Sequence, residues 1–352
     1  MKIAQIAPLA ESVPPRLYGG TERVVSYLTE ELVRLGHDVT LFASGDSQTS
    51  ARLVACAPRA LRLDPRVRDP LPHHLLMIER VRSRAHEFDV LHFHVEHVHL
   101  PLFRPMARKC VTTLHGRLDL PDLAALYREF ADMPLVSISD AQRKPLAHAN
   151  WVGTVYHGLP EPVCPFNPAP RGPHGAPCLA FLGRISPEKG IERAIEIARR
   201  AARPLRIAAK IDQSEEGYWR SRIAPLLSGP LVDFLGEVNE EDKPALLGNA
   251  SALLFPIDWP EPFGLAMIEA MSCGTPVIAW PNGSVPEIVE HGVTGFIVSS
   301  IEEAVAAVHE APRLDRAQVR RRFEERFSAA RMARDYLAVY RRLAAPRKER
   351  AA

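Results

Sequence analysis

Short apolar runs alternate with helix-periodic segments along the first part of the chain. Buried strands are predicted at residues 2–7, 39–43, 89–94, 110–115 and 135–139. Residues 22–35 carry apolar side chains at the three- and four-residue spacing of an amphipathic helix, and Gly36 ends it. This alternation predicts a parallel sheet with helices on both faces.

A proline-rich stretch interrupts the pattern, which then starts again. Seven prolines fall between positions 160 and 177. Beyond them, strands are predicted at residues 178–184, 205–209, 232–235, 252–255, 276–279 and 295–298, and helices at 191–202, 263–272 and 329–343. The chain is therefore expected to form two Rossmann-like, doubly wound α/β domains with a ligand cleft between them. Their expected bounds are 1–160 and 178–327, with a linker at 161–177 and a final helix in 328–352.

The composition excludes several classes of protein. With 46% hydrophobic and 24% charged residues, the 352-residue chain can bury full cores. Its net charge of +2 is too small for a chain-wide nucleic-acid-binding surface. From Arg313 to the end there are 13 basic and 5 acidic residues. We interpret this excess as the solvated face of the final helix rather than a membrane or nucleic-acid patch.

The cysteines and the first residues predict the cellular setting. The five cysteines are widely spaced and form no Cys-x-x-Cys pair, so neither a disulfide framework nor a zinc ribbon is expected. The first apolar run is too short for a signal peptide, and no stretch reaches the roughly 18 apolar residues of a membrane span. We expect a cytoplasmic protein.

The strongest candidate chemistry lies around two glutamates, Glu261 and Glu269. Pro262 suits the entry to a helix, and Gly264 lets a ligand approach the backbone, whose free amides form an anion site. Eight helical steps would separate the carboxylates by about 12 Å, too far for a glycosidase pair at about 5–9.5 Å. The spacing suits a nucleoside-diphosphate sugar. The alternative is a helix with two surface glutamates.

A second candidate segment, residues 183–190, contains two cations. Arg184 ends a predicted strand, and Lys189 follows Ser186 and Pro187, which suit the N-cap and first position of a helix. A lysine near a helix N-terminus opposes the helix dipole. A bound anion would explain both cations, whereas the alternative is a capped helix with a solvated lysine.

A third candidate, Gly19-Gly20, follows the first strand and allows backbone amides to face a phosphate. The loop matches neither G-x-G-x-x-G nor the P-loop pattern, and no acidic residue follows the second strand. These departures disfavour a dinucleotide cofactor and exclude a P-loop nucleotidase.

Histidines are dense near two of the predicted strands, at His92, His94, His97, His99 and His115. His92 and His94 share one strand face, and Glu96 could complete a metal site. We favour the simpler interpretation, in which these are polar residues at strand ends. His115, which precedes Gly116, is the better candidate for a polar ligand contact.

Together these motifs resemble the retaining glycosyltransferases of family 4, a GT-B group also described as glycosyl transferases group 1. The resemblance covers nearly the whole chain, and the pairing of residues 183–190 with the two spaced glutamates is specific. It implies a hexosyltransferase that uses a nucleotide sugar and needs no metal or other cofactor. It also implies retention by front-face attack, with the leaving phosphate as base, and a final helix that crosses back to the first domain.

The resemblance also implies a role for each candidate residue. Arg184 and Lys189 would hold the donor diphosphate, with Gly19 and Gly20 closing on it. Glu261 would contact the sugar hydroxyls and Glu269 the ribose, while His115 would contact the sugar near the reacting centre. The amides of Phe263, Gly264 and Leu265 would face the phosphates.

Two departures from the family pattern bear on the nucleotide. Many members carry Asn-Gly where this chain has His157-Gly158, and many have a glycine-rich turn where it has Lys210-Ile211-Asp212. Uridine is the commonest base in the family, so we expect a UDP-sugar and an unidentified hydroxyl acceptor bound by loops such as residues 44–68.

Other functions remain open from the sequence. A GT-B nucleotide-sugar epimerase, a phosphorylase and a non-catalytic sugar-nucleotide-binding protein would share the fold. Arg184, Lys189 and Glu261 are all present, which favours catalysis. No nucleic-acid partner is expected and at most a peripheral membrane contact, and the oligomeric state stays open.

Overall fold

The structure is a computed structural model that describes residues 1–161, 163–172 and 178–344. It divides into two compact units: unit 1 is Met1–His157 with the chain from Ala329 onward, and unit 2 is Gly158–Ser328. The sequence placed these divisions at residues 160 and 327. Positions 162 and 173–177 of the expected linker, and 345–352 of the basic tail, lie outside the described residues.

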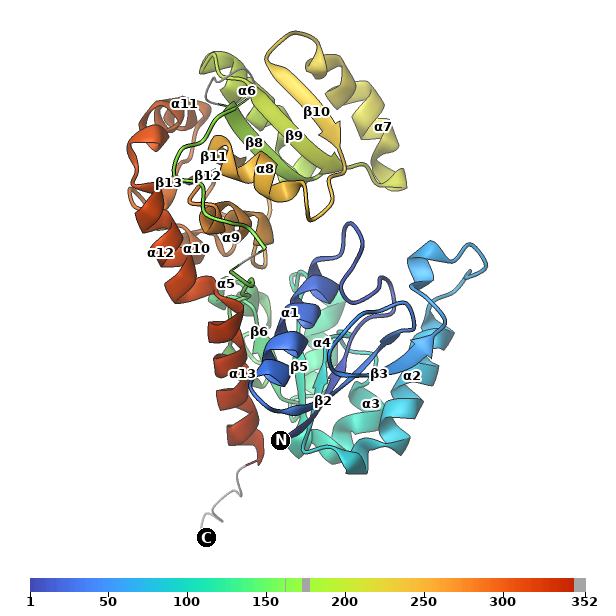
Figure 1. Ribbon diagram of the computed structural model, residues 1–352. Helices are drawn as coiled ribbons and strands as arrows, with labels where there is room; N and C mark the ends of the chain where they lie inside the picture. The colour runs from blue at the N-terminus through green and yellow to red at the C-terminus, as the bar shows by residue number, and fades with distance from the viewer. Residues whose placement is uncertain (162, 173–177, 345–352) are drawn as a thin grey trace. The chain divides into compact units, whose positions relative to one another are not determined.

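Unit 1 contains a seven-stranded parallel sheet in the order β3-β2-β1-β4-β5-β6-β7 (Figure 1). The strands are β1 (Lys2–Ile6), β2 (Asp38–Ser44), β3 (Arg52–Ala57), β4 (Val90–Phe93), β5 (Cys110–Thr113), β6 (Leu135–Ser137) and β7 (Trp151–Thr154). The sequence did not predict β3 and β7, which are the two edge strands. Their side chains are mostly half-buried, so their apolar signal is weak.

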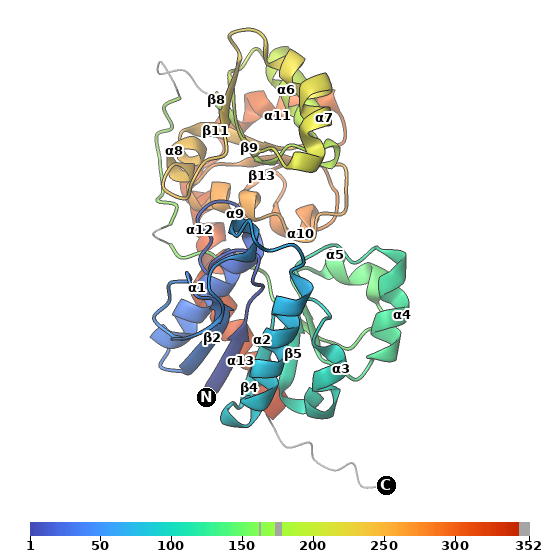
Figure 2. The ribbon, with the colours of Figure 1, turned by 90° about the vertical axis from the view of Figure 1, so that its right-hand side faces the viewer.

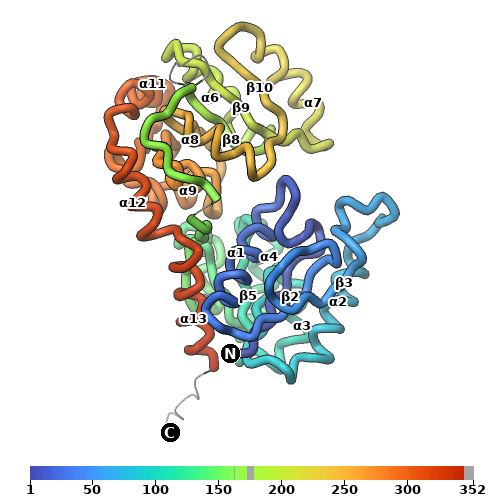
Figure 3. The backbone as a smooth tube through the Cα atoms, viewed as in Figure 1, coloured from blue at the N-terminus to red at the C-terminus, as the bar shows by residue number. Residues whose placement is uncertain are grey.

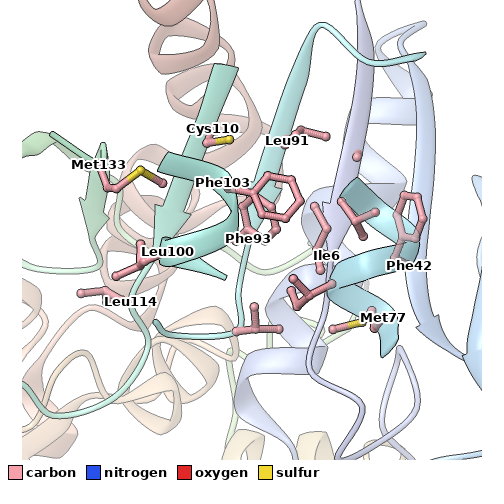
Figure 4. Close-up of a cluster of buried hydrophobic side chains, with 14 of the residues drawn as sticks. Ile6, Phe42, Met77, Leu91, Phe93, Leu100, Phe103, Cys110, Leu114 and Met133 are labelled. Carbon is pink, nitrogen blue, oxygen red and sulfur yellow. The ribbon is translucent and has the colours of Figure 1, made fainter. Parts of the chain in front are cut away.

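The helices of unit 1 cover both faces of this sheet. They are α1 (Gly20–Arg34), α2 (Leu71–Ser83), α3 (Leu100–Phe103), α4 (Pro121–Glu129), α5 (Asp140–Arg143) and α13 (Ala329–Ala344). Phe42 and Phe93 pack with α2 and α3 on one face (Figure 4), whereas Leu41 packs with Val25 of α1 on the other. The C-terminal helix α13, red in Figure 3, contacts α1.

Unit 2 contains a six-stranded parallel sheet in the order β10-β9-β8-β11-β12-β13. Figure 2 labels β8, β9, β11 and β13 of this sheet. The strands are β8 (Cys178–Arg184), β9 (Leu205–Lys210), β10 (Val232–Gly236), β11 (Ala250–Phe255), β12 (Val277–Ala279) and β13 (Gly295–Ile297). Its helices are α6 (Ile191–Arg200), α7 (Glu216–Tyr218), α8 (Lys243–Gly248), α9 (Leu265–Ser272), α10 (Val285–Ile288), α11 (Ile301–Glu310) and α12 (Arg316–Phe327).

Both sheets reverse their direction of growth at one point. In unit 1 this point lies between β1 and β4, and in unit 2 between β8 and β11. Loops that leave such neighbouring strands diverge to opposite faces, which opens a crevice at the carboxyl ends of the strands. The two reversal points therefore position the candidate sites.

Candidate functional site

The predicted site residues divide between the two units. Gly19, Gly20 and His115 belong to unit 1. The others belong to unit 2, and they are Arg184, Lys189, Glu261, Phe263, Gly264, Leu265 and Glu269.

Lys189 and Glu261 form an ion pair at the reversal point of unit 2. Lys189 ends a short 3₁₀ turn after β8, and Glu261 lies in the loop after β11. The Lys189 Nζ lies 2.5 Å from Glu261 Oε2, and both side chains are largely buried. The indole of Trp259 donates to the same oxygen at 3.0 Å, and its ring lies 4.6 Å from the ammonium. A cation, a carboxylate and an aromatic face thus occupy one crevice.

Ser186 and Pro187 occupy the N-cap and the first position, as predicted, but of a short 3₁₀ turn rather than of α6. These residues start the 3₁₀ turn Pro187–Lys189, and α6 begins only at Ile191 after Gly190 in a left-handed conformation. The Ser186 side chain accepts no capping bond. A Cβ at Gly190 would overlap the carbonyl of Pro256, so glycine allows the turn to approach the β11 loop.

Arg184, the last residue of β8, pairs with other carboxylates: its Nη2 lies 3.8 Å from Glu188, the residue before Lys189. Its Nη1 contacts Asp212 Oδ2 at 3.2 Å, and Lys210 contacts the same carboxylate at 3.1 Å. Burial opposes ionisation of Asp212, but Lys210 and Arg184 outweigh it and lower the pKa of this carboxyl. Lys210-Ile211-Asp212, the segment that departs from the family pattern, therefore holds Arg184 in a charged cluster.

The loop that carries Glu261 is held by backbone contacts with a second loop, which contains Gly283 and Ser284. The Ser284 amide donates to the Glu261 carbonyl at 2.9 Å, and Gly283, at a φ of +58°, lies directly against the Glu261 backbone. Only glycine tolerates both that conformation and that contact. The position of Glu261 is thus set by main-chain contacts as well as by its ion pair.

The helix expected to join the two glutamates starts later than predicted. α9 begins at Leu265, with Gly264 as N-cap at a φ of +82°, so Pro262 and Phe263 lie in the preceding loop. Only the steps from Leu265 onward are helical, and the expected 12 Å of continuous helix rise between the carboxylates was wrong. The Met267 amide donates to the Gly264 carbonyl at 3.0 Å, so the amides of Leu265 and Ala266 are the ones that lack an intrahelical partner at this helix start.

Glu269 is not the surface glutamate of the alternative interpretation. It is 4% exposed, and its Oε1 accepts from Lys243 Nζ at 2.9 Å. Lys243, also buried, contacts Glu240 at 2.5 Å as well. Lys243 was not among the site residues predicted from the sequence. Its only signal was a lysine at the start of a helix, where the dipole disfavours it.

Gly19 and Gly20 start α1 at the reversal point of unit 1. Gly19 is the N-cap and Gly20 the first helical residue. A Cβ at Gly19 would lie 2.8 Å from Cβ of Pro15, so the loop packs closely on itself. The first amides of α1, like those of α9, have no carbonyl partner within their own helix and can donate to a ligand.

His115 follows β5 and is surrounded by other polar rings. Its Nε2 lies 2.9 Å from Nδ1 of His94, and its ring stacks on that of His157 with centroids 5.3 Å apart. Burial lowers the pKa of His115 to about 3, so the imidazole is neutral at physiological pH. His157, which stands where many family members have asparagine, thus packs directly on the candidate residue.

Glu96, a candidate from the sequence only as a metal ligand, lies in the same region, since the amides of His115 and Gly116 bond to it. It has a positive φ of +54°, rare for a residue other than glycine. Burial raises the pKa of its carboxyl to about 7, although the amides of His115 and Gly116 bond to it and oppose the shift.

His92 and His94 engage all four ring nitrogens in hydrogen bonds within the protein. His92 contacts Tyr340 and Thr113, and His94 contacts Gln5 and His115, at 2.7–2.9 Å. In the part of the chain that the structure describes, no three His, Cys, Asp or Glu side chains group as metal ligands would. His97 is exposed, and His99 bonds Thr112 at 2.8 Å.

None of the helices in the described ranges has both the length and the apolar character needed to cross a bilayer. The five cysteines, all within the described residues, are free thiols.

Comparison with known proteins gives matches to both units. The sequence profile described as "Glycosyltransferase Family 4" matches residues 18–157, and that described as "Glycosyl transferases group 1" matches residues 167–326. The chain is 26% identical to a glycogen synthase of Mycobacterium tuberculosis over 93% of both chains.

Two solved structures share the fold over nearly the full length. AviGT4, a glycosyltransferase involved in avilamycin A biosynthesis, superposes with a TM-score of 0.74 at 24% identity and covers 98% of both chains. The Anabaena protein HepE, solved with UDP and glucose, superposes with a TM-score of 0.73 at 19% identity, over 96% of this chain and 98% of its own. The fold is therefore GT-B, as the sequence predicted.

Proposed function

Because the chain belongs to glycosyltransferase family 4, the glycosyl transferases group 1, we propose that it transfers a hexosyl group from a UDP-sugar to a hydroxyl acceptor with retention of anomeric configuration. Its assignment as a glycosyltransferase enzyme that uses a nucleotide sugar rests on the family. The base, the stereochemistry and the residue roles below are our proposals.

The observation that carries the proposal is the Lys189–Glu261 pair at the reversal point of unit 2. A nucleoside-diphosphate sugar presents anionic oxygens next to hydroxyl donors. The ammonium at this crevice matches the diphosphate, and the carboxylate 2.5 Å from it matches the sugar hydroxyls. When the donor binds, the Lys189 ammonium pairs with the diphosphate instead of the Glu261 carboxylate. Glu261 then accepts hydrogen bonds from the sugar hydroxyls instead of from Lys189.

Charge stabilisation of the leaving diphosphate is the main chemical task of the site. Lys189 and Arg184 supply fixed cations, and the amides of Phe263, Gly264 and Leu265 at the start of α9 supply oriented dipoles. The amides of Gly19 and Gly20 serve the same diphosphate. These groups do what a divalent cation does in other transferases, so we propose a reaction without a metal or other cofactor.

The remaining residues orient the two ends of the donor. We assign Glu269, held by Lys243, to the ribose hydroxyls, and His115 to the donor sugar near the reacting carbon. Retention follows from front-face attack by the acceptor hydroxyl, whose proton passes to the departing phosphate oxygen. No side chain then forms a covalent intermediate.

The uridine base is proposed from two sources. It is the commonest base among family members, and HepE, which shares the fold, was solved with UDP. A cytoplasmic setting is part of the proposal as well, supported by five cysteines that remain free thiols in the described structure.

A thermal-shift screen of the full chain against UDP-glucose, ADP-glucose and GDP-mannose tests the donor. Ligands that bind only the folded state raise the melting temperature by mass action. We expect the largest rise with the UDP-sugar, and an equal or larger rise with another base would reject uridine. Incubation with the stabilising donor and no acceptor then separates a transferase, which leaves the sugar configuration unchanged, from an epimerase.

Metal independence is tested on the transfer reaction itself. We expect activity to survive dialysis against EDTA, with release of the nucleoside diphosphate as readout. Loss of activity that a divalent ion restores would refute this part of the proposal and would make carboxylates or histidines of the site metal ligands.

A further inference from the structure

A continuous series of hydrogen bonds lies buried in unit 1 between the sheet and α13. We call it the polar series, and it consists of His115, His94, Gln5, Tyr340, His92, Thr113 and Tyr336. Consecutive members are joined at 2.7–3.1 Å. Gln5 lies in β1, His92 in β4 and Thr113 in β5, and the two tyrosines lie in α13. His94 directly follows β4, and His115 lies just beyond β5. His115 is one end of the series and Tyr336 the other.

Gln5 determines the direction of the bonds that lead to His115. Its Oε1, which can only accept, faces Nε2 of His94 at 2.8 Å, while its amide nitrogen donates to Tyr340 at 3.1 Å. Nε2 of His94 therefore carries the proton. Burial lowers the pKa of His94 well below the usual value, so this ring is neutral and its Nδ1 is an acceptor.

The acceptor role of His94 Nδ1 in turn determines which nitrogen of His115 carries the proton. Its Nε2 lies 2.9 Å from the accepting Nδ1 of His94 and must donate. Since His115 is neutral as well, its Nδ1 has no proton and is a hydrogen-bond acceptor. This Nδ1 atom is buried and has no hydrogen-bond partner among the described residues.

The opposite direction of the series is physically worse. If Gln5 were flipped, every bond would reverse, and Nδ1 of His115 would carry a buried N–H without an acceptor. Orphaned buried N–H groups are rarer than under-satisfied acceptors, since a donor has only one proton to place. The hydrogen-bond partners of Gln5 and the cost of an unpaired buried N–H thus both favour the Nε2–H tautomer of His115.

We propose that Gln5 and His94 are positioning residues that hold His115 in the Nε2–H tautomer, so that its Nδ1 accepts a hydrogen bond from a hydroxyl group of the substrate. The identity of that substrate rests on the proposed function. A donor sugar with a hydroxyl at this point satisfies the acceptor, whereas a carboxylate there, as in a uronic acid, would face a lone pair and be disfavoured.

The tautomer is measured first, without any assay of activity. In the full-length protein labelled with ¹⁵N-histidine, the His115 signals are identified by their loss in His115→Asn. We expect the protonated nitrogen to be Nε2 at neutral pH. A dominant Nδ1–H tautomer, or an equal mixture, would overturn the inference even if the enzyme transfers sugar as proposed.

The variant Gln5→Met removes both hydrogen-bonding atoms and keeps an unbranched side chain of similar length. We expect a mixed His115 tautomer and a fall in kcat of roughly tenfold to a hundredfold, by analogy with the loss of a partner that orients a metal-binding histidine. The donor KM should change little. An unchanged tautomer in Gln5→Met would show that Gln5 does not hold His115.

A double variant tests whether Gln5 acts through His115. His115→Ala combined with Gln5→Met should be no slower than His115→Ala alone, because the group that Gln5 positions is already gone. Additive losses would overturn the inference. The matched control is Thr112→Val, which removes the buried bond to His99 outside the polar series and should leave kcat unchanged.

These outcomes separate the inference from the proposed function. The expected tautomer in a protein that releases no nucleoside diphosphate from any nucleotide sugar leaves the positioning intact and rejects the function. Transfer activity with the opposite tautomer does the reverse.

Discussion

Lys189 and Glu261 neutralise each other at the reversal point of unit 2, and each is the other's nearest charged partner there. A substitution of either residue therefore has two effects. Removing one member deprives the ligand of a contact and also leaves the other charge largely buried without compensation. Predictions at the scale of residues have to separate these effects.

Lys189→Ala should lower kcat by roughly a hundredfold, the scale of losing one preorganised group that stabilises the charge of a leaving group. Arg184→Ala should also lower kcat. Steady-state release of the nucleoside diphosphate is the measurement. The control is Arg206→Ala, since Arg206 pairs with Asp233 on the same sheet away from the crevice. Wild-type kcat in Lys189→Ala would remove this lysine from the site.

Glu261→Gln and Glu269→Gln should show different kinetics. Glu261 is assigned to the sugar, where contacts strengthen in the transition state, so its loss should mainly lower kcat. Glu269 is assigned to the ribose, where binding is uniform, so its loss should mainly raise the donor KM. Donor titrations on both variants decide this, and identical signatures would reject the proposed orientation of the donor.

Both glutamine variants should also lose stability, because the two carboxylates lie in buried ion pairs rather than in a solvated cleft. We expect a loss of about 1–3 kcal/mol in the free energy of unfolding, since glutamine still accepts a hydrogen bond. Chemical denaturation with and without donor distinguishes this loss from the kinetic effects.

At the scale of elements, the loop with Gly283 and the loop with Glu261 act as a unit. The Gly283 φ of +58° and its contact with the Glu261 backbone leave no room for a side chain. The start of α9 depends on the same geometry, since Gly264 also has a left-handed φ. The crevice of unit 2 is thus built by close backbone approaches that only glycine permits.

Gly283→Ala should therefore impair both stability and donor binding. The left-handed conformation alone costs about 1–2 kcal/mol, and the overlap with Glu261 displaces its loop. Gly292→Ala is the matched control, because Gly292 has a φ of +77° but nothing within 4 Å of its Cβ position. The control should lose stability only. An equal donor KM in the two variants would show that the loop contact does not position Glu261.

At the scale of the whole molecule, unit 1 buries an unusual set of neutral histidines. Burial lowers the pKa of each of them, to about 3 for His99 and His115 and well below the usual value for His92, His94 and His157. The unfolded chain takes up protons on these groups near pH 6.5, while the folded chain does not.

Folding stability should accordingly fall as the pH decreases below about 6.5. Each depressed histidine contributes about 1.4 kcal/mol of loss at one pH unit below its unfolded pKa, and the loss continues until the folded pKa is reached. Glu96, whose pKa is raised to about 7, acts in the opposite sense and offsets about one histidine. Melting temperatures between pH 7.5 and 5.5 measure the net effect.

A variant tests whether the buried neutral histidines cause this loss of stability at low pH. His99→Leu removes one depressed histidine and should reduce the slope of stability against pH by about one proton. A flat stability profile in the wild-type protein, or an unchanged slope in His99→Leu, would contradict the neutral buried state of these rings.

The sequence by itself determined the features that depend on local pattern. The central strands, such as those predicted at residues 178–184 and 110–115 and observed as β8 and β5, were found because buried strands form continuous apolar runs. The family and the fold followed from motifs read within a few residues of one another, chiefly the segments around Lys189 and Glu261. The residue roles stay predictions until the variants are measured.

Only the tertiary structure decided how these residues pair. Lys189 and Glu261 are 72 positions apart, Lys243 and Glu269 are 26 apart, and Gln5 and His94 are 89 apart. A periodic pattern reports whether a position is buried but not which distant polar atom meets it there. The start of α9 and the edge strands β3 and β7 were missed for a related reason. Left-handed glycines and half-buried strands are set by neighbours brought close in space, and these leave little trace in local hydrophobicity.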